Sequence, residues 1–107
     1  MIASLNGRVL ALESSSVVID VAGVGYLVQI TPSTSSTLAV DHNAFLFTAM
    51  IVREDGFTLF GFTTVAEQKL FDLLRSVSGV GPKSALAILG ELSVDQVVDA
   101  VAQENDA

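Results

Sequence analysis

The sequence predicts an α+β protein, in which a small antiparallel β-barrel over residues 1–62 precedes an all-α domain over residues 63–107. Three observations lead to this class. Apolar residues alternate with a period of two over the first sixty positions, glycines interrupt the alternation where a curved sheet would bend, and the apolar period becomes helical after Phe62. Five or six short strands without a helical crossover favour a closed barrel of the OB-fold type over a sandwich.

The first predicted strands form a curved sheet with a hairpin. The apolar run from Ile2 to Leu12 is interrupted by Gly7, which suits a bend or a bulge. Residues 17–21 and 26–30 follow a period of two, and the turn Gly23-Val24-Gly25 separates them. Alternation on both sides of a glycine-rich turn predicts a β-hairpin.

Two more strands complete the predicted barrel. Residues 45–52 carry apolar side chains on both strand faces, and residues 57–62 return as a further strand. Asp55-Gly56 predicts a tight turn between them, because both residue types tolerate positive φ angles. The polar segment Thr31–Thr37, which precedes these strands, predicts a loop.

Three helices are predicted after the last strand. Thr64 and Glu67 form a capping box, in which the hydroxyl and the carboxylate satisfy free amides at a helix start. Helical spacing then relates the apolar residues Leu70, Phe71, Leu73, Leu74 and Val77. Pro82 suits the first position of a second helix, for which Gly90 is the predicted C-cap. Ser93 begins a second capping box and a third helix.

Residues 78–85, Ser-Gly-Val-Gly-Pro-Lys-Ser-Ala, are the most informative stretch, because two helices joined by apolar-Gly-apolar-Gly form the helix-hairpin-helix pattern. Gly79 permits a left-handed backbone and leaves room for a phosphate, while Val80 fixes the turn by entering the cleft between the helices. Gly81 and the helix that starts at Pro82 present free N–H groups where the helix dipole is positive. These features predict contacts to the DNA backbone that carry no base information.

Two polar side chains add to this predicted anion site. Lys83 supplies a positive charge, and the Ser84 hydroxyl can donate a further hydrogen bond. The alternative interpretation is an ordinary αα-hairpin whose glycines only end a helix. One hairpin contacts few phosphates, so its affinity should lie at or below the non-specific range of about 10⁻⁴ to 10⁻⁶ M. Useful binding therefore requires several linked copies, which predicts oligomerisation.

No catalytic residue, metal site or cofactor is predicted. The adjacent carboxylates Glu54 and Asp55 resemble a solvated hairpin tip, and His42 is predicted to be a surface residue in a separate loop. An isolated carboxylate pair lacks the ligand count that Mg²⁺ or Ca²⁺ requires, and the absence of cysteine excludes thiolate chemistry. No Walker-type nucleotide motif is present. A protein-interaction scaffold is the main rival to DNA binding.

The charge balance argues against a free-standing nucleic-acid binder. The chain has 12 acidic and 5 basic residues, a net charge of -7 and a pI near 4.2. Five of the acids lie in residues 91–107, which contain no Lys or Arg, so residues 1–90 carry seven acids against five bases. Binding would therefore depend on local placement of charge. Without a secretory signal or a membrane-spanning apolar run, the sequence predicts an intracellular protein.

Several motifs resemble the RuvA family in order and spacing, across essentially the whole chain. They are Met1-Ile2-Ala3, Leu5-Asn6-Gly7, Gly23-Val24-Gly25-Tyr26, Val52-Arg53-Glu54-Asp55-Gly56, Leu59-Phe60-Gly61-Phe62, Glu67 with Leu70-Phe71, and residues 77–89. RuvA is the bacterial subunit that recognises Holliday junctions and supports branch migration. The resemblance implies an OB-fold barrel followed by a domain with two helix-hairpin-helix motifs. It also implies a cytoplasmic role in DNA recombination and repair and in the SOS response to DNA damage.

The resemblance further implies site residues and partners. The first DNA-binding hairpin of the family is matched by Gly79, Val80, Gly81, Pro82, Lys83 and Ser84. Glu54 and Asp55 match the acidic pin that faces the crossover, which replaces their interpretation as a solvated turn, and Arg53 beside them is a predicted phosphate contact. The implied partners are a four-way junction held open and planar, a homotetramer or an octamer of this chain, the RuvB ATPase motor and the RuvC resolvase. The chain itself would be a non-catalytic subunit of an ATP-dependent helicase complex.

The sequence departs from the family at its C-terminal end. Family chains are longer, with a second glycine-rich hairpin and a C-terminal domain that engages RuvB. This sequence stops at Asp106-Ala107, before the second hairpin is expected. We therefore expect residues 1–107 to bind junctions weakly and not to recruit the motor.

Overall fold

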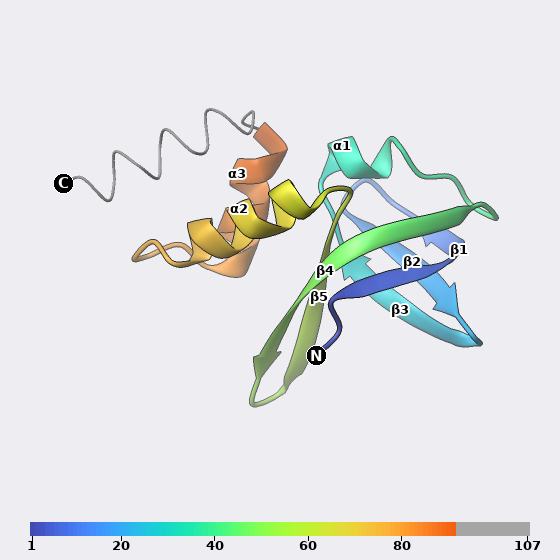
Figure 1. Cartoon of the computed structure of the whole chain (residues 1–107), viewed down its shortest axis with the longest axis horizontal. Coiled ribbons are helices and arrows are strands. Elements are labelled where there is room, and N and C mark those ends of the chain that lie inside the picture. Colours follow the sequence, from blue (N-terminus) through green and yellow to red (C-terminus); the bar gives the residue numbers. More distant parts are fainter. Residues whose placement is uncertain (92–107) are drawn as a thin grey trace.

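A computed structural model describes residues 1–91 of the chain. The third predicted helix and its capping box at Ser93 lie outside the described residues. In chain order the elements are β1 (Ser4–Leu12), β2 (Ser16–Val21), β3 (Val24–Gln29), α1 (Pro32–Ser35), β4 (Asn43–Arg53), β5 (Gly56–Phe62), α2 (Val65–Arg75) and α3 (Pro82–Glu91). In Figure 1 the strands curl into a barrel, the helices α2 and α3 lie beside it, and the β4–β5 hairpin projects away from both.

The predicted barrel is confirmed, with five strands in the closed order β1-β2-β3-β5-β4. Four of the strand contacts are antiparallel, and β3 pairs with β5 in parallel, at Val28↔Leu59 and Gln29↔Phe60. A parallel contact closes the barrel because β4 intervenes in the chain between β3 and β5. The period-two alternation places one face of every strand inside. The resulting barrel core contains Leu5, Val9, Val17, Ile19, Val28, Ile30, Ala44, Leu46 and Leu59.

Gly7 allows the first strand to approach its neighbour closely and does not form a bulge. A methyl group on Gly7 would overlap the backbone carbonyl oxygen of Asp20, so only glycine fits there. The bulge lies three residues further on, where the pairing register with β2 shifts between Val9 and Ala11. The predicted distortion of this strand is thus present, but at a different position.

Both predicted hairpins form, although their turn residues differ from the prediction. The β2–β3 turn is Ala22-Gly23, with φ angles of 52° and 90°, so Val24 and Gly25 belong to the strand. The β4–β5 turn is Glu54-Asp55, between the paired residues Arg53 and Gly56. Asp55 does not adopt a positive φ; Gly56 does, at 144°. The glycine thus carries the unusual backbone alone.

The segment predicted as a loop at Thr31–Thr37 contains the short helix α1. The Thr31 hydroxyl caps it by accepting a hydrogen bond from the Thr34 amide at 3.1 Å, and Pro32 occupies its first position. A run of Ser, Thr and Pro resembles a loop by composition, but a Thr followed by Pro is also a helix start. The loop prediction was wrong for this local reason.

A second core joins the helices to the outside of the barrel. It contains Ala49, Phe60, Phe62, Leu70, Phe71, Leu74 and Ala85. The Phe71 ring lies 5.0 Å from the rings of both Phe60 and Phe62, measured between centroids. β4 and β5 serve both cores because their two faces are apolar. Leu73 does not join this core and is exposed on α2, contrary to its place in the predicted apolar stripe.

The sequence predicted Gly90 as the C-cap of the second helix, but α3 continues through Gly90 to Glu91. A methyl group on Gly90 would contact Thr31 and Pro32 at 3.7 to 3.9 Å. This glycine therefore lies where α3 passes the start of α1. These are ordinary van der Waals distances, so the packing leaves room for a methyl group at this position.

Candidate nucleic-acid interface

The helix that leads into the glycine turn is fixed at its start by threonine hydroxyls. Thr64 caps α2 by accepting a hydrogen bond from the Glu67 amide at 3.2 Å, as predicted. The Glu67 carboxylate does not reach back to a backbone amide. It accepts a hydrogen bond from the Thr63 hydroxyl at 2.7 Å instead. α2 therefore starts where the sequence predicted, with half of the expected capping box.

The turn between α2 and α3 has the geometry that the pattern predicted. α2 ends at Arg75 with Ser76 as its C-cap, and the Val80 amide donates a hydrogen bond to the Val77 carbonyl at 3.1 Å. The Val80 side chain is half-buried and packs against the second core, so it anchors the turn. Gly79 adopts a φ of 85°, a left-handed conformation that favours glycine.

Gly81 stands at the N-terminal cap of α3. Its carbonyl accepts the first helical hydrogen bond, from the Ala85 amide at 2.9 Å. The amides of Lys83 and Ser84 have no acceptor among residues 1–91, and Pro82 has no amide hydrogen. The first turn of a helix concentrates such free N–H groups and the positive end of the helix dipole. This end of α3 therefore suits an anion.

The two glycines of the turn are needed for different reasons. Gly79 is required by its backbone angle. Gly81 has no positive φ, and a methyl group placed on it would meet no atom within 4 Å. Nothing within residues 1–91 therefore excludes a side chain at position 81. The absence of a side chain at position 81 leaves space there for an external group to approach closely.

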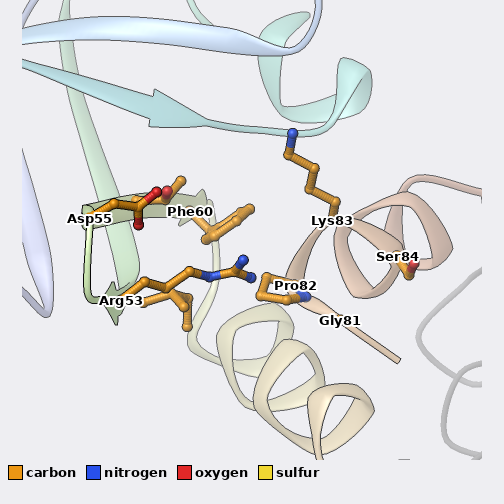
Figure 2. A pocket seen from close by; sticks show the side chains of 9 residues that line it. Arg53, Asp55, Phe60, Gly81, Pro82, Lys83 and Ser84 are labelled. Carbon is orange, nitrogen blue, oxygen red and sulfur yellow. The ribbon is translucent and has the colours of Figure 1, made fainter. Parts of the chain in front are cut away.

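The N-terminus of α3 and the β4–β5 hairpin line one open pocket of about 460 Å³ (Figure 2). We call it the pin–hairpin pocket. Its lining residues are Ile51, Arg53, Asp55, Thr58 and Phe60 from β4–β5 and Gly81, Pro82, Lys83 and Ser84 from the start of α3. Figure 2 shows the Arg53 side chain extending toward Pro82. Residues about thirty positions apart in the sequence thus face one another.

The pocket has two cationic side chains at its border. Neither Arg53 nor Lys83 forms an ion pair within residues 1–91, where the two salt bridges are Arg8–Asp41 and Arg75–Asp72. Lys83 also borders a second pocket that it shares with Thr31 and Pro32. In Figure 2 its side chain extends away from Arg53. The two positive charges therefore flank the helix end rather than compete for one point.

Not every predicted site residue reaches this pocket. Asp55 lines it, whereas Glu54, its neighbour at the hairpin tip, does not, and both are exposed. Gly79 and Val80 shape the turn without lining the pocket. His42 is exposed, as predicted. Residues 1–91 contain no group of three or more His, Cys, Asp or Glu that could hold a metal ion, and none of their helices is long and apolar enough to cross a membrane.

Sequence reasoning missed the pocket residues Ile51, Thr58 and Phe60. They occur on the same face of the hairpin as Arg53, because Arg53↔Gly56, Ile51↔Thr58 and Ala49↔Phe60 are cross-strand pairs two residues apart. The alternation in residues 45–62 could have identified this face. It could not have shown that α3 lies opposite.

Comparison with known proteins identifies relatives that match the sequence along its whole length. The model of the RuvA N terminal domain matches residues 1–61. A protein from Leifsonia xyli subsp. xyli named Holliday junction branch migration complex subunit RuvA is 52% identical over 107 residues, which is all of this chain and 52% of that protein. Proteins of the same name from Nocardia farcinica and Mycobacterium avium are 49% and 56% identical over 107 and 89 residues. These matches cover 100% and 83% of this chain, and 53% and 45% of the relatives. The chain thus spans about half the length of these curated relatives.

Proposed function

Because this chain belongs to the RuvA family, we propose that it binds the sugar–phosphate backbone of four-way junction DNA without reading base sequence. It acts as a non-catalytic subunit of a branch migration complex in the bacterial cytoplasm. The observation that carries this proposal is the pin–hairpin pocket, which is lined both by Lys83 and Ser84, whose amides have no acceptor within residues 1–91, and by Arg53 of the β4–β5 hairpin. Backbone amides at a helix N-terminus and flanking cations are the usual ligands of a phosphate.

Each residue of the pocket has a distinct role in this proposal. The amides of Lys83 and Ser84 donate to a phosphate, and the open side of Gly81 lets the DNA backbone approach. The Lys83 ammonium and the Arg53 guanidinium add charge on two sides of the helix end. Such contacts position a duplex but do not distinguish bases.

The acidic tip of the hairpin repels phosphates and routes strands rather than binding them. Glu54 and Asp55 are exposed at the end of a projecting hairpin, with Arg53 immediately behind them. A carboxylate–phosphate pair about 10 Å apart repels by roughly 0.4 kcal/mol in water, and salt reduces this further. The tip therefore lowers affinity little. We propose that it keeps phosphates apart at the crossover, so that strands enter separate arms.

Useful affinity requires several copies of the chain. One hairpin that contacts a few phosphates binds at about 10⁻⁴ to 10⁻⁶ M or more weakly, whereas linked sites raise avidity by about 10² to 10⁴. A homotetramer, alone or as two tetramers in an octamer, would place one helix-hairpin-helix motif on each arm of a junction. RuvB, as the ATPase motor, and RuvC, as the resolvase, are the proposed protein partners of the complete subunit.

The proposal is tested by charge reversal at the pocket. Fluorescence anisotropy would measure binding of a labelled four-way junction and of a linear duplex at several salt concentrations. Lys83→Glu combined with Gly81→Asp is expected to abolish junction binding, because it places carboxylates beside the free amides of α3. Lys83→Gln alone should reduce the slope of log affinity against log salt by about 0.9 for each copy of the chain that contacts the junction, because each copy loses one phosphate contact.

Lys69→Glu is the matched control. Lys69 is exposed on α2 and does not line the pin–hairpin pocket, so Lys69→Glu makes the same change in net charge as Lys83→Glu alone, at another place. It should leave junction binding within about twofold if local placement of charge decides binding. An equal loss of junction affinity in both charge-reversal variants would mean that net charge alone explains the effect. Junction binding that survives Lys83→Glu with Gly81→Asp, with assembly unchanged, would exclude this site and favour an interaction scaffold.

A further inference from the structure

A second cleft, of about 290 Å³, opens between β3 and β5 at the base of the β4–β5 hairpin. Its lining residues include Tyr26, Leu27 and Gln29 of β3 and Phe57, Thr58 and Leu59 of β5. We call it the β3–β5 cleft. Phe57 and Leu59 lie on the strand face opposite to that of Phe60, which lines the pin–hairpin pocket. The hairpin thus separates two cavities of different chemistry.

The cleft exists because the parallel contact that closes the barrel is short. β3 and β5 pair at Val28↔Leu59 and Gln29↔Phe60. Earlier in both strands, residues 24–27 are paired with β2 and residues 56–58 are paired with β4, but the two segments are not paired with each other. Each segment therefore presents a free strand edge to the cleft, with backbone donors and acceptors that no strand within residues 1–91 satisfies.

An aromatic ring lies exposed on one wall of this cleft. The side chains of Phe57 and its cross-strand partner Val52 are 55% and 68% exposed. The preceding pair on the same face, Met50↔Leu59, belongs to the barrel core or packs against it. Phe57 and Val52 thus continue the interior face of the barrel beyond the point where another strand covers it. On the other wall, Tyr26 is half-buried against the barrel core.

We infer that the β3–β5 cleft binds an unpaired nucleobase at the branch point of the junction, an inference that rests on the proposed function. A nucleobase needs a ring to stack on and polar groups along its edge. Phe57 supplies the ring, and the free strand edges with Gln29 supply donors and acceptors. OB-fold barrels in general bind nucleic acid on the surface formed by strands 2 and 3 and the loop between strands 4 and 5.

The distribution of charge on the hairpin favours a base over a phosphate or another protein strand in the cleft. Arg53 borders the pocket on the other face, so it holds phosphates there and leaves a base to project toward Phe57. The acids at the tip discourage a phosphate from lying between the two faces. Each free edge is only three or four residues long, because β3 and β5 pair with each other from Val28↔Leu59 onward. Little length is therefore left for an added strand.

The inference is tested with two four-way junctions that differ only at the branch point. One is intact, and the other has abasic nucleotides in place of the branch-point bases. Binding of the full chain to each is measured by anisotropy at low salt, with wild type, Phe57→Ser and Phe57→Tyr. Stacking of one base predicts that Phe57→Ser weakens binding to the intact junction about 5- to 150-fold and leaves binding to the abasic junction unchanged. Phe57→Tyr, which keeps the ring, should restore affinity for the intact junction.

Phe45→Ser is the matched control, because Phe45 is also an exposed phenylalanine of the barrel, 48% exposed, but does not line the cleft. It should weaken binding to neither junction. Equal weakening of both junctions by Phe57→Ser, or of neither, overturns the base site while leaving the phosphate site standing. A changed oligomeric state of Phe57→Ser in light scattering would show that a second copy covers the ring, which also overturns it. If wild type shows no preference for a junction over linear duplex, the proposed function fails instead.

Discussion

The barrel core and the second core meet at β4 and β5, which contribute opposite faces to them, yet the two cores are constrained in different ways. The barrel closes on itself through five strand contacts, and Gly7 and Gly61 within its strands are crowded: a methyl group on Gly61 would lie 2.7 Å from a Val28 methyl carbon. The helical part depends on the outside of the barrel for its apolar contacts, and its glycines at 79 and 81 face open space. The barrel sequence is therefore limited by internal packing at these positions, whereas the turn between α2 and α3 is limited by the backbone angle of Gly79.

The largest expected effect tests whether the two cores are separable. Phe71→Ala removes the ring that contacts both Phe60 and Phe62, and should cost about 3–5 kcal/mol of unfolding free energy. Because the barrel closes without the helices, we expect the helical circular dichroism to be lost at lower urea concentration than the barrel signal. Tyr26, the one tyrosine of a chain without tryptophan, packs against the barrel core and reports that signal by fluorescence.

Wild type is the reference for that measurement. The matched variant is Ile19→Ala, because Ile19 is fully buried in the barrel core. Ile19→Ala should move both signals together, since the helices need the barrel surface. Coincident transitions in Phe71→Ala would instead mean that the two cores unfold as one unit.

A smaller effect is expected from a single methyl group inside the barrel. Gly7→Ala should destabilise the protein by about 1–3 kcal/mol, because the new methyl overlaps the Asp20 carbonyl and the strands must separate. Urea denaturation followed by Tyr26 fluorescence measures this loss. An unchanged urea midpoint would show that β1 and β2 can shift to make room for the methyl group. The crowded glycines of the barrel would then be no more constrained than Gly81.

The two glycines in the turn between α2 and α3 should respond differently to the same substitution. Gly79→Ala is expected to cost about 1–2 kcal/mol of stability, because alanine is strained at a φ of 85°. Gly81→Ala should leave stability unchanged, since its methyl group would meet no atom within 4 Å, yet weaken junction binding. Denaturation and anisotropy on both variants separate the roles. Full junction affinity in Gly81→Ala would mean that no DNA backbone approaches this position closely.

The smallest expected effect on binding concerns the hairpin tip. Glu54→Gln with Asp55→Asn removes two exposed charges that form no ion pair within residues 1–91, so stability should not change. Each lost repulsion is worth roughly 0.4 kcal/mol before screening, so junctions should bind as well or slightly better. Branch migration should nevertheless become abnormal in an assay reconstituted with the complete subunit and its motor. Normal migration by this variant would contradict the proposed role of the tip.

The sequence alone determined the local structure of this protein. Alternation of apolar residues located all five strands, Thr64 located the start of α2, and the spacing of Gly79 and Gly81 identified the turn between two helices. Each of these depends on neighbours within a few residues, through side-chain periodicity, capping or backbone angles. The loop prediction at Thr31–Thr37 failed because the same residue types favour both loops and helix starts.

Only the tertiary structure decided which distant residues meet. The parallel contact between β3 and β5, the passage of α3 beside α1 at Gly90, and the position of Arg53 opposite Pro82 all join segments separated along the chain. No local pattern encodes these contacts, because they result from closing the barrel and from burying one face of each helix on it. The pin–hairpin pocket and the β3–β5 cleft are consequences of that closure, which brings residues chosen by local rules into shared cavities.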